Sequence, residues 1–162
     1  MSLLRAFYAG AVHRWHTNPW LAGTSDRVDG HAARVARIIL MWHPSPSLTL
    51  IGAALIHDDG EHAVGDIKAP FKTMRPDIAE ALAVAEAHAA GDIWGCDAVM
   101  DGDDDIRWLI MADKLDAYMW AAHHGAPMDR DGWPDAREVL AIMADGLGVL
   151  DDLQAVLREV GK

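Results

Sequence analysis

The chain has 162 residues, of which 51% are hydrophobic and 24% are charged, and its formal net charge at pH 7 is −11. This length fits one domain, residues 1–162, with enough apolar side chains to bury a core. Because proteins bind nucleic-acid backbones mainly through Lys and Arg, the acidic balance and the lack of a basic block argue against a nucleic-acid polymer as partner.

Periodic apolar residues predict about six helices, and no segment shows the alternation that is typical of a strand. Segments that contain Pro and Gly separate the helices. The predicted helices cover about residues 2–15, 28–43, 48–60, 77–90, 104–124 and 134–160. The sequence therefore predicts an all-α fold, a single bundle of about six helices.

The first and last predicted helices carry apolar stripes. The first stripe runs from Leu3 through Phe7 to Trp15. The last stripe has near-heptad spacing, but Gly146 and Gly148 argue against a straight coiled coil. We expect the last helix to pack on the rest of the domain.

Three of the inner helices place ionisable residues on sides that should face the core. His31 shares a face with apolar residues at i+4, i+7 and i+11. The apolar run 50–56 ends abruptly in His57 and Asp58, and Asp113 interrupts an apolar row in the helix 104–124. Burying such groups costs several kcal/mol unless a metal or a partner charge offsets the cost.

These four residues together predict a metal site. Two imidazoles and two carboxylates suit a divalent ion such as Mn²⁺, Co²⁺, Fe²⁺, Zn²⁺ or Mg²⁺. Four protein ligands leave positions on a six-coordinate ion for water and a substrate oxygen. A lone inward His is usually a satisfied core residue, and the composition alone predicts about one His-Asp dipeptide. The prediction therefore depends on all four residues occurring together.

Nothing in the sequence directs the chain to a membrane or to an oxidising compartment. No apolar run approaches the ~20 residues that span a bilayer. The N-terminal segment MSLLRAFYAGAV lacks the organisation of a signal peptide. Cys96 is the only cysteine and cannot form an internal disulfide, which agrees with a reducing compartment. We expect a cytoplasmic protein.

With these motifs the chain resembles the HD-domain metal-dependent phosphohydrolases, whose pattern is H…HD…D on an all-α core. It is most similar to the bacterial 5′-deoxynucleotidases and their short phage relatives, which include dNTP triphosphohydrolases. The blocks that carry the resemblance are Arg14-Trp15-His16-Thr17-Asn18-Pro19, His57-Asp58-x-x-Glu61-x-x-x-Gly65-Asp66 with Pro70 and Lys72, and Ala112-Asp113-Lys114-Leu115.

The resemblance implies a role for each matching residue. His31, His57, Asp58 and Asp113 would bind the metal, and Glu61 would position or deprotonate the attacking water. The resemblance further implies that Asp66 contacts the sugar hydroxyl, that Arg14 and Lys72 bind phosphate, and that Trp15 lines the sugar pocket. It also implies a small nucleotide as substrate and a homo-oligomeric enzyme.

Two reactions remain open at this point. The enzyme would release either phosphate from a deoxynucleoside monophosphate or triphosphate from a dNTP, because both reactions attack the α-phosphorus. Lys68, Lys72 and Arg75 are the cations that would favour the triphosphate reaction. The alternative to an enzyme is a non-catalytic helical nucleotide-binding module with a vestigial or structural metal site.

Overall fold

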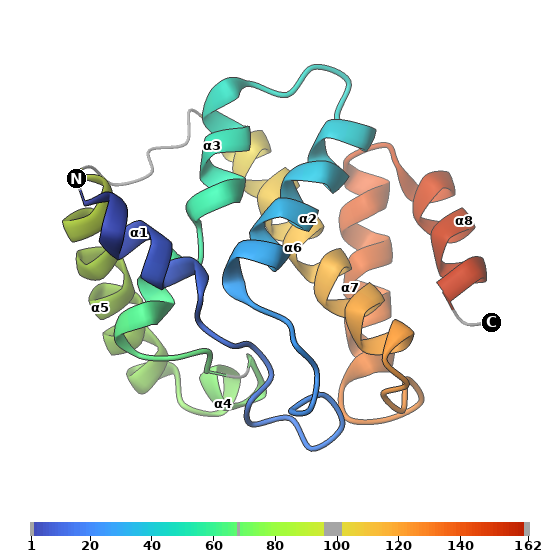
Figure 1. The fold of residues 1–162 in the computed structure, drawn as a ribbon. Helices are drawn as coiled ribbons and strands as arrows, with labels where there is room; N and C mark the ends of the chain where they lie inside the picture. The colour runs from blue at the N-terminus through green and yellow to red at the C-terminus, as the bar shows by residue number, and fades with distance from the viewer. Residues whose placement is uncertain (1, 68, 96–101, 161–162) are drawn as a thin grey trace.

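The computed structural model describes residues 2–67, 69–95 and 102–160, and the regular elements in them are helices. Figure 1 shows α2, α3 and α6 at the centre, α1 and α5 on one side, and α7 and α8 on the other. The elements are α1 (Leu3–Gly10), α2 (Val28–Trp42), α3 (Leu48–Ile56), the short 3₁₀ helix η1 (Asp59–Ala63), α4 (Ala69–Met74), α5 (Pro76–Trp94), α6 (Asp103–His123), α7 (Trp133–Gly146) and α8 (Leu150–Val160). The prediction of an all-α fold is confirmed.

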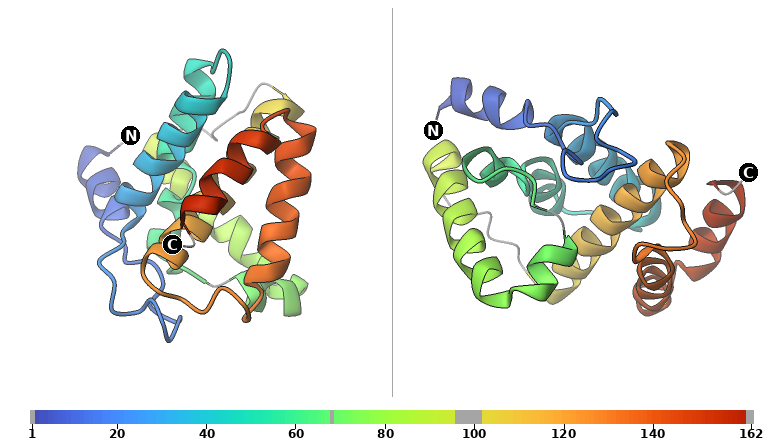
Figure 2. Two further views of the ribbon diagram at one scale, coloured as in Figure 1. Left: turned by 90° about the vertical axis from the view of Figure 1, so that its right-hand side faces the viewer. Right: turned by 90° about the horizontal axis from the view of Figure 1, so that it is seen from below.

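The main core lies where α2, α3 and α6 meet, and α7 and α8 close it on one side (Figure 2). Met111 and Leu115 of α6 are buried there, and each such side chain contributes about 1.5–3 kcal/mol to folding. Leu140 of α7 and Leu153 of α8 are also fully buried. The three central helices are therefore held in fixed relative positions by apolar packing.

The first helix is shorter than predicted. Ser2 caps α1, since its side-chain oxygen accepts a hydrogen bond from the backbone of Arg5 at 3.3 Å, but the helix ends at Gly10. Residues 12–14 then pair with residues 26–28, including an isolated antiparallel bridge between His13 and Arg27. Trp15 therefore lies in a loop. The predicted stripe is not a core face, because the side chains of Leu3 and Phe7 are 89% and 70% exposed.

Three further boundaries differ from the prediction. The segment predicted as a loop, 62–76, contains the short helix α4, and α5 continues to Trp94. The predicted last helix is two helices, because residues 147–149 form a turn in which Gly148 has a φ of +75°, a conformation that favours glycine. Within the described residues, no helix combines the length and the hydropathy of a transmembrane span.

The chain changes direction sharply after α3. The α-helix ends at Ile56, His57 is its C-cap, and η1 follows within three residues. Gly60 of η1 packs directly against the backbone of α5, where an added Cβ would overlap the carbonyl oxygen of Glu86. This close approach fixes η1, which carries Glu61, against α5.

The variant Gly60→Ala is therefore expected to destabilise the protein by about 1–3 kcal/mol, the usual cost of overpacking. Gly91→Ala on α5 is the matched control, because a Cβ there meets no atom within 4 Å. The control should stabilise by about 0.5–1 kcal/mol, since alanine restricts the unfolded chain. Urea denaturation measures both changes, and a Gly60→Ala midpoint at or above the wild-type value would contradict the packing described for η1.

Candidate metal centre

The structure brings together the four side chains that the sequence predicts as metal ligands. His31 lies on α2, His57 and Asp58 follow the end of α3, and Asp113 lies on α6. One ligand atom from each residue lies within 4.8 Å of the other three. The cluster has nitrogen and oxygen donors from three separate helices, and it could hold a metal ion.

The distances within the cluster fit a shared ion. Nε2 of His31 lies 3.1 Å from Oδ1 of Asp113 and 3.3 Å from Oδ2 of Asp58. Nε2 of His57 lies 3.4 Å from Oδ1 of Asp58 and 4.0 Å from Oδ1 of Asp113. Because nitrogen and oxygen ligands bind such ions at about 2.0–2.2 Å, two adjacent ligands of one ion lie about 3 Å apart.

Both imidazoles present the same nitrogen to the cluster. Nδ1 of His31 contacts Oδ2 of Asp116 at 2.6 Å, and Nδ1 of His57 donates to the carbonyl oxygen of Ala54 at 3.0 Å. Both Nε2 atoms are buried, and neither makes a hydrogen bond of acceptable geometry within the described residues. Since buried polar atoms are nearly always paired, two unpaired nitrogens that face two carboxylates fit a cation between them.

The carboxylates control the ionisation of the cluster. Burial alone would lower the pKa of His31, but its contacts with Asp113, Asp116 and Asp58 raise that pKa to about 10. For Asp58, burial acts to raise the pKa, yet the nearby imidazoles of His57 and His31 hold it below its usual range. Protons and metal ions therefore compete for the Nε2 atom of His31.

Glu61 lies beside this cluster on η1. Its side chain is buried, and its Oε2 atom has no hydrogen-bond partner within the described residues. Burial raises the pKa of Glu61, and the negative charges of Asp58 and Asp66 raise it further, to about 8. The structure thus provides a carboxyl group that can gain or lose a proton near neutral pH, as acid–base chemistry requires.

The loop that follows α1 brings Arg14 and Trp15 to the same region. Trp15 has a φ of +66°, and its backbone N–H donates to Oδ2 of Asp66 at 2.7 Å. Its indole Nε1 donates to Oδ2 of Asp26 at 2.9 Å. Arg14 is buried and lies 3.3 Å from Asp26 and 3.7 Å from Asp116. Arg14 and the indole of Trp15 therefore both contact the buried carboxylate of Asp26. The carboxylate of Asp66 contacts the backbone of Trp15.

The other predicted phosphate-binding cations lie at the edge of this region. Nζ of Lys72 forms an ion pair with Oε1 of Glu86 at 3.3 Å. Arg75 pairs with Asp77 at 2.7 Å on the surface, and Lys68 lies outside the described residues. Lys72 is close enough to Glu61 to lower the pKa of that carboxyl. Of the described cations among these, Lys72 is the one whose charge acts on Glu61.

Three further residues of this region, Asp26, Arg34 and Asp116, are not indicated by the apolar pattern of the sequence. The side chains of Asp26 and Asp116 are almost fully buried, and Arg34 bridges them through hydrogen bonds of 2.6 Å to Asp116 and 2.8 Å to Asp26. One sequence signal was available, because Asp116 lies three residues after Asp113 on the same helix. Two carboxylates one turn apart on a buried helix indicate that at least one has a buried partner.

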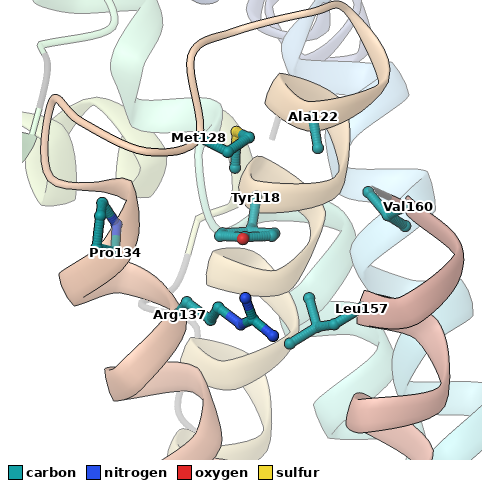
Figure 3. Close-up of a pocket in the computed structure, with 7 residues that line it drawn as sticks. All are labelled: Tyr118, Ala122, Met128, Pro134, Arg137, Leu157 and Val160. Atoms are coloured by element: carbon teal, nitrogen blue, oxygen red, sulfur yellow. The ribbon is translucent and has the colours of Figure 1, made fainter. Parts of the chain in front are cut away.

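A cavity of about 580 Å³ lies elsewhere, between α6, α7 and α8 (Figure 3). Tyr118, Arg137 and Leu157 are among its lining residues, and the lining includes none of the predicted site residues. Its walls combine apolar side chains with the guanidinium group of Arg137 and the ring of Tyr118, and no metal-binding cluster in the described residues adjoins it. The residues able to support hydrolytic chemistry are therefore those around His31.

Metal binding near pH 7.5 is expected to release at least about one proton, because the imidazolium of His31 must be deprotonated before Nε2 can bind an ion and a bound cation also favours the ionised form of Glu61. Calorimetric titration with Mn²⁺ in buffers of different ionisation enthalpy measures this proton count. Asp113→Ala is the control and should show greatly weakened binding. Binding heats that are independent of the buffer would contradict the ionisation described for His31.

Comparisons of this chain with protein-family models, with curated proteins and with solved structures give no match.

Proposed function

We propose that this protein is a metal-dependent phosphohydrolase that acts at the α-phosphate of a 5′-deoxynucleotide. The observation that carries the proposal is the cluster of His31, His57, Asp58 and Asp113, with the buried carboxyl of Glu61 beside it. The resemblance of the same residues to the HD-domain pattern supports the reaction class. A homo-oligomer remains part of this prediction.

The ligand set defines what a bound ion would contribute. A divalent ion held by these four side chains would polarise a phosphoryl oxygen and lower the pKa of a coordinated water. The protein itself supplies the orientation of the ligands, since the Nδ1 atoms of both imidazoles contact other groups. It also buries His31 fully, which strengthens the electrostatic interactions of that ring.

Glu61 is the candidate general base. In its ionised form, the carboxylate would accept a proton from the attacking water and so generate the nucleophile. The unpaired Oε2 atom is suited to this contact, because no protein group competes for it within the described residues. A structural metal site would not need such a group, so the position of Glu61 favours catalysis.

Both deoxynucleotide reactions remain compatible with the surrounding charges. Lys72 and Arg75 are paired with Glu86 and Asp77, but exposed or half-exposed pairs contribute only about 0–1 kcal/mol, so phosphate groups can replace the carboxylates. These two cations would support β- and γ-phosphates, and Lys72 alone would support a monophosphate. The substrate panel described below separates the two reactions.

A non-catalytic nucleotide-binding module is the second candidate, and one observation favours it. The charged groups of Arg14 and Asp66 already have protein partners, namely Asp26 and the backbone of Trp15. In such a module, these residues would stabilise the loop and the metal ion would be structural. This candidate predicts nucleotide binding without turnover.

The proposal is tested directly by incubating the protein with dNMPs, NMPs and dNTPs, each in the presence of Mn²⁺, Co²⁺ or Mg²⁺. We expect hydrolysis of deoxynucleotides, with release of phosphate from dNMPs or of triphosphate from dNTPs. Product analysis by ion-exchange chromatography identifies the bond that breaks. Binding of nucleotides with no product across the panel would instead support the non-catalytic module.

Glu61→Gln is expected to leave the metal affinity unchanged and to slow turnover at least ~100-fold, the lower range for loss of a general base. Glu80→Gln on the exposed face of α5 is the matched control and should retain wild-type turnover. Asp58→Ala and Asp113→Ala should lose both metal binding and activity. Steady-state kinetics with parallel calorimetry measure both properties, and wild-type turnover by Glu61→Gln would refute the role given to Glu61.

A further inference from the structure

Asp116 contacts the side of His31 that faces away from the metal cluster. Its Oδ2 atom lies 2.6 Å from Nδ1 of His31, while Nε2 of the same ring faces Asp58 and Asp113. Both His31 and Asp116 are buried. A neutral imidazole carries one proton, and a carboxylate at Nδ1 holds that proton there. The lone pair of Nε2 is then directed into the cluster.

Arg34 holds the carboxylate of Asp116 in this orientation. Its Nε donates to Oδ1 at 2.6 Å and its Nη2 donates to Oδ2 at 3.0 Å, which is a two-point contact. The guanidinium group also lies over the ring of Trp120, 4.3 Å from the ring centroid. Arg34 is three residues after His31 on α2, so one face of α2 carries both the ligand and the group that orients its partner.

The same guanidinium group reaches the loop that carries Arg14 and Trp15. Nη2 of Arg34 donates to Oδ1 of Asp26 at 2.8 Å, and Oδ2 of Asp26 accepts the hydrogen bond from the indole of Trp15 at 2.9 Å. Arg14 lies on the same Asp26 oxygen at 3.3 Å. Two buried carboxylates are thus paired with the buried Arg14 and the half-buried Arg34, and the charges of these four groups balance.

We infer that Asp116 is a positioning residue for the metal centre, and that it fixes the Nδ1–H tautomer and the ring orientation of His31. Through Arg34, Asp26 extends this arrangement to the loop with Arg14 and Trp15. Asp116 therefore acts on metal affinity, while Asp26 acts on the nucleotide-binding loop. This inference rests on the proposed function, because it assumes that His31 binds a metal ion and that the loop contacts the substrate.

Asp116→Asn and Asp26→Asn are matched isosteric variants for the test. Asp116→Asn is expected to weaken Mn²⁺ binding by about 10–100-fold, the usual effect of losing a partner of a metal-bound imidazole. Asp26→Asn should leave Mn²⁺ affinity within about threefold and raise KM for the nucleotide about tenfold, as expected when a charged hydrogen bond is lost. Electron paramagnetic resonance of free Mn²⁺ measures the first property without any substrate.

A measurement on the wild-type protein makes the test independent of variant folding. Long-range ¹H–¹⁵N NMR spectra of the Zn²⁺-loaded protein report which nitrogen of His31 carries the proton. The inference expects a proton on Nδ1 and the ion on Nε2, and it is overturned by the opposite tautomer or by wild-type Mn²⁺ affinity in Asp116→Asn. Reduced affinity in that variant together with a silent substrate panel would support the inference and reject the proposed phosphohydrolase activity.

Discussion

The burial of His31 between carboxylates on both sides of its ring is the constraint on which the rest of the structure depends. The residue is fully buried, and its contacts come from Asp58 after α3 and from Asp113 and Asp116 on α6. Burying an ionisable group without such partners costs several kcal/mol. The packing of α2, α3 and α6 brings these charges together, and the pairing of the charges in turn offsets the cost of burying them. Core and candidate site are one region of the molecule.

Periodicity along single helices predicted the fold class and pointed to the four residues that the structure brings into one cluster, but it did not point to Asp116. The predicted stripe on α6 placed Asp113 in the core, whereas the structure leaves its side chain 37% exposed at the edge of the cluster. Asp116, one turn further, is 3% exposed. Hydrophobic patterning does not show which of two carboxylates on one helix is buried, because the burial of Asp116 depends on Arg34 and His31 of another helix. The identity of these partners is a property of the tertiary structure.

Long-range contacts also explain the predictions that were wrong near the termini. The predicted first helix would continue to Trp15, but residues 12–14 pair with residues 26–28 instead. Trp15 adopts a left-handed backbone conformation that is rare for a bulky residue. Hydrogen bonds to Asp66 and Asp26 offset the cost of that conformation. Helix propensity within residues 2–15 contains no information about either carboxylate, so the sequence pattern alone favoured a longer helix.

Charge balance then sets a requirement for the proposed function, in which the site would accept a phosphate ester. The ion pairs among Arg14, Arg34, Asp26 and Asp116 are internally balanced, so the two carboxyl groups of the cluster, Asp58 and Asp113, remain to match a divalent ion. The negative charge of a bound phosphate must be met by open positions on the ion and by nearby cations, because the chain as a whole carries −11. Arg14 retains a buried Nε with no hydrogen-bond partner within the described residues. In the proposed phosphohydrolase, this N–H group would be the part of Arg14 left for a phosphate oxygen, because Nη1 is already paired with Asp26.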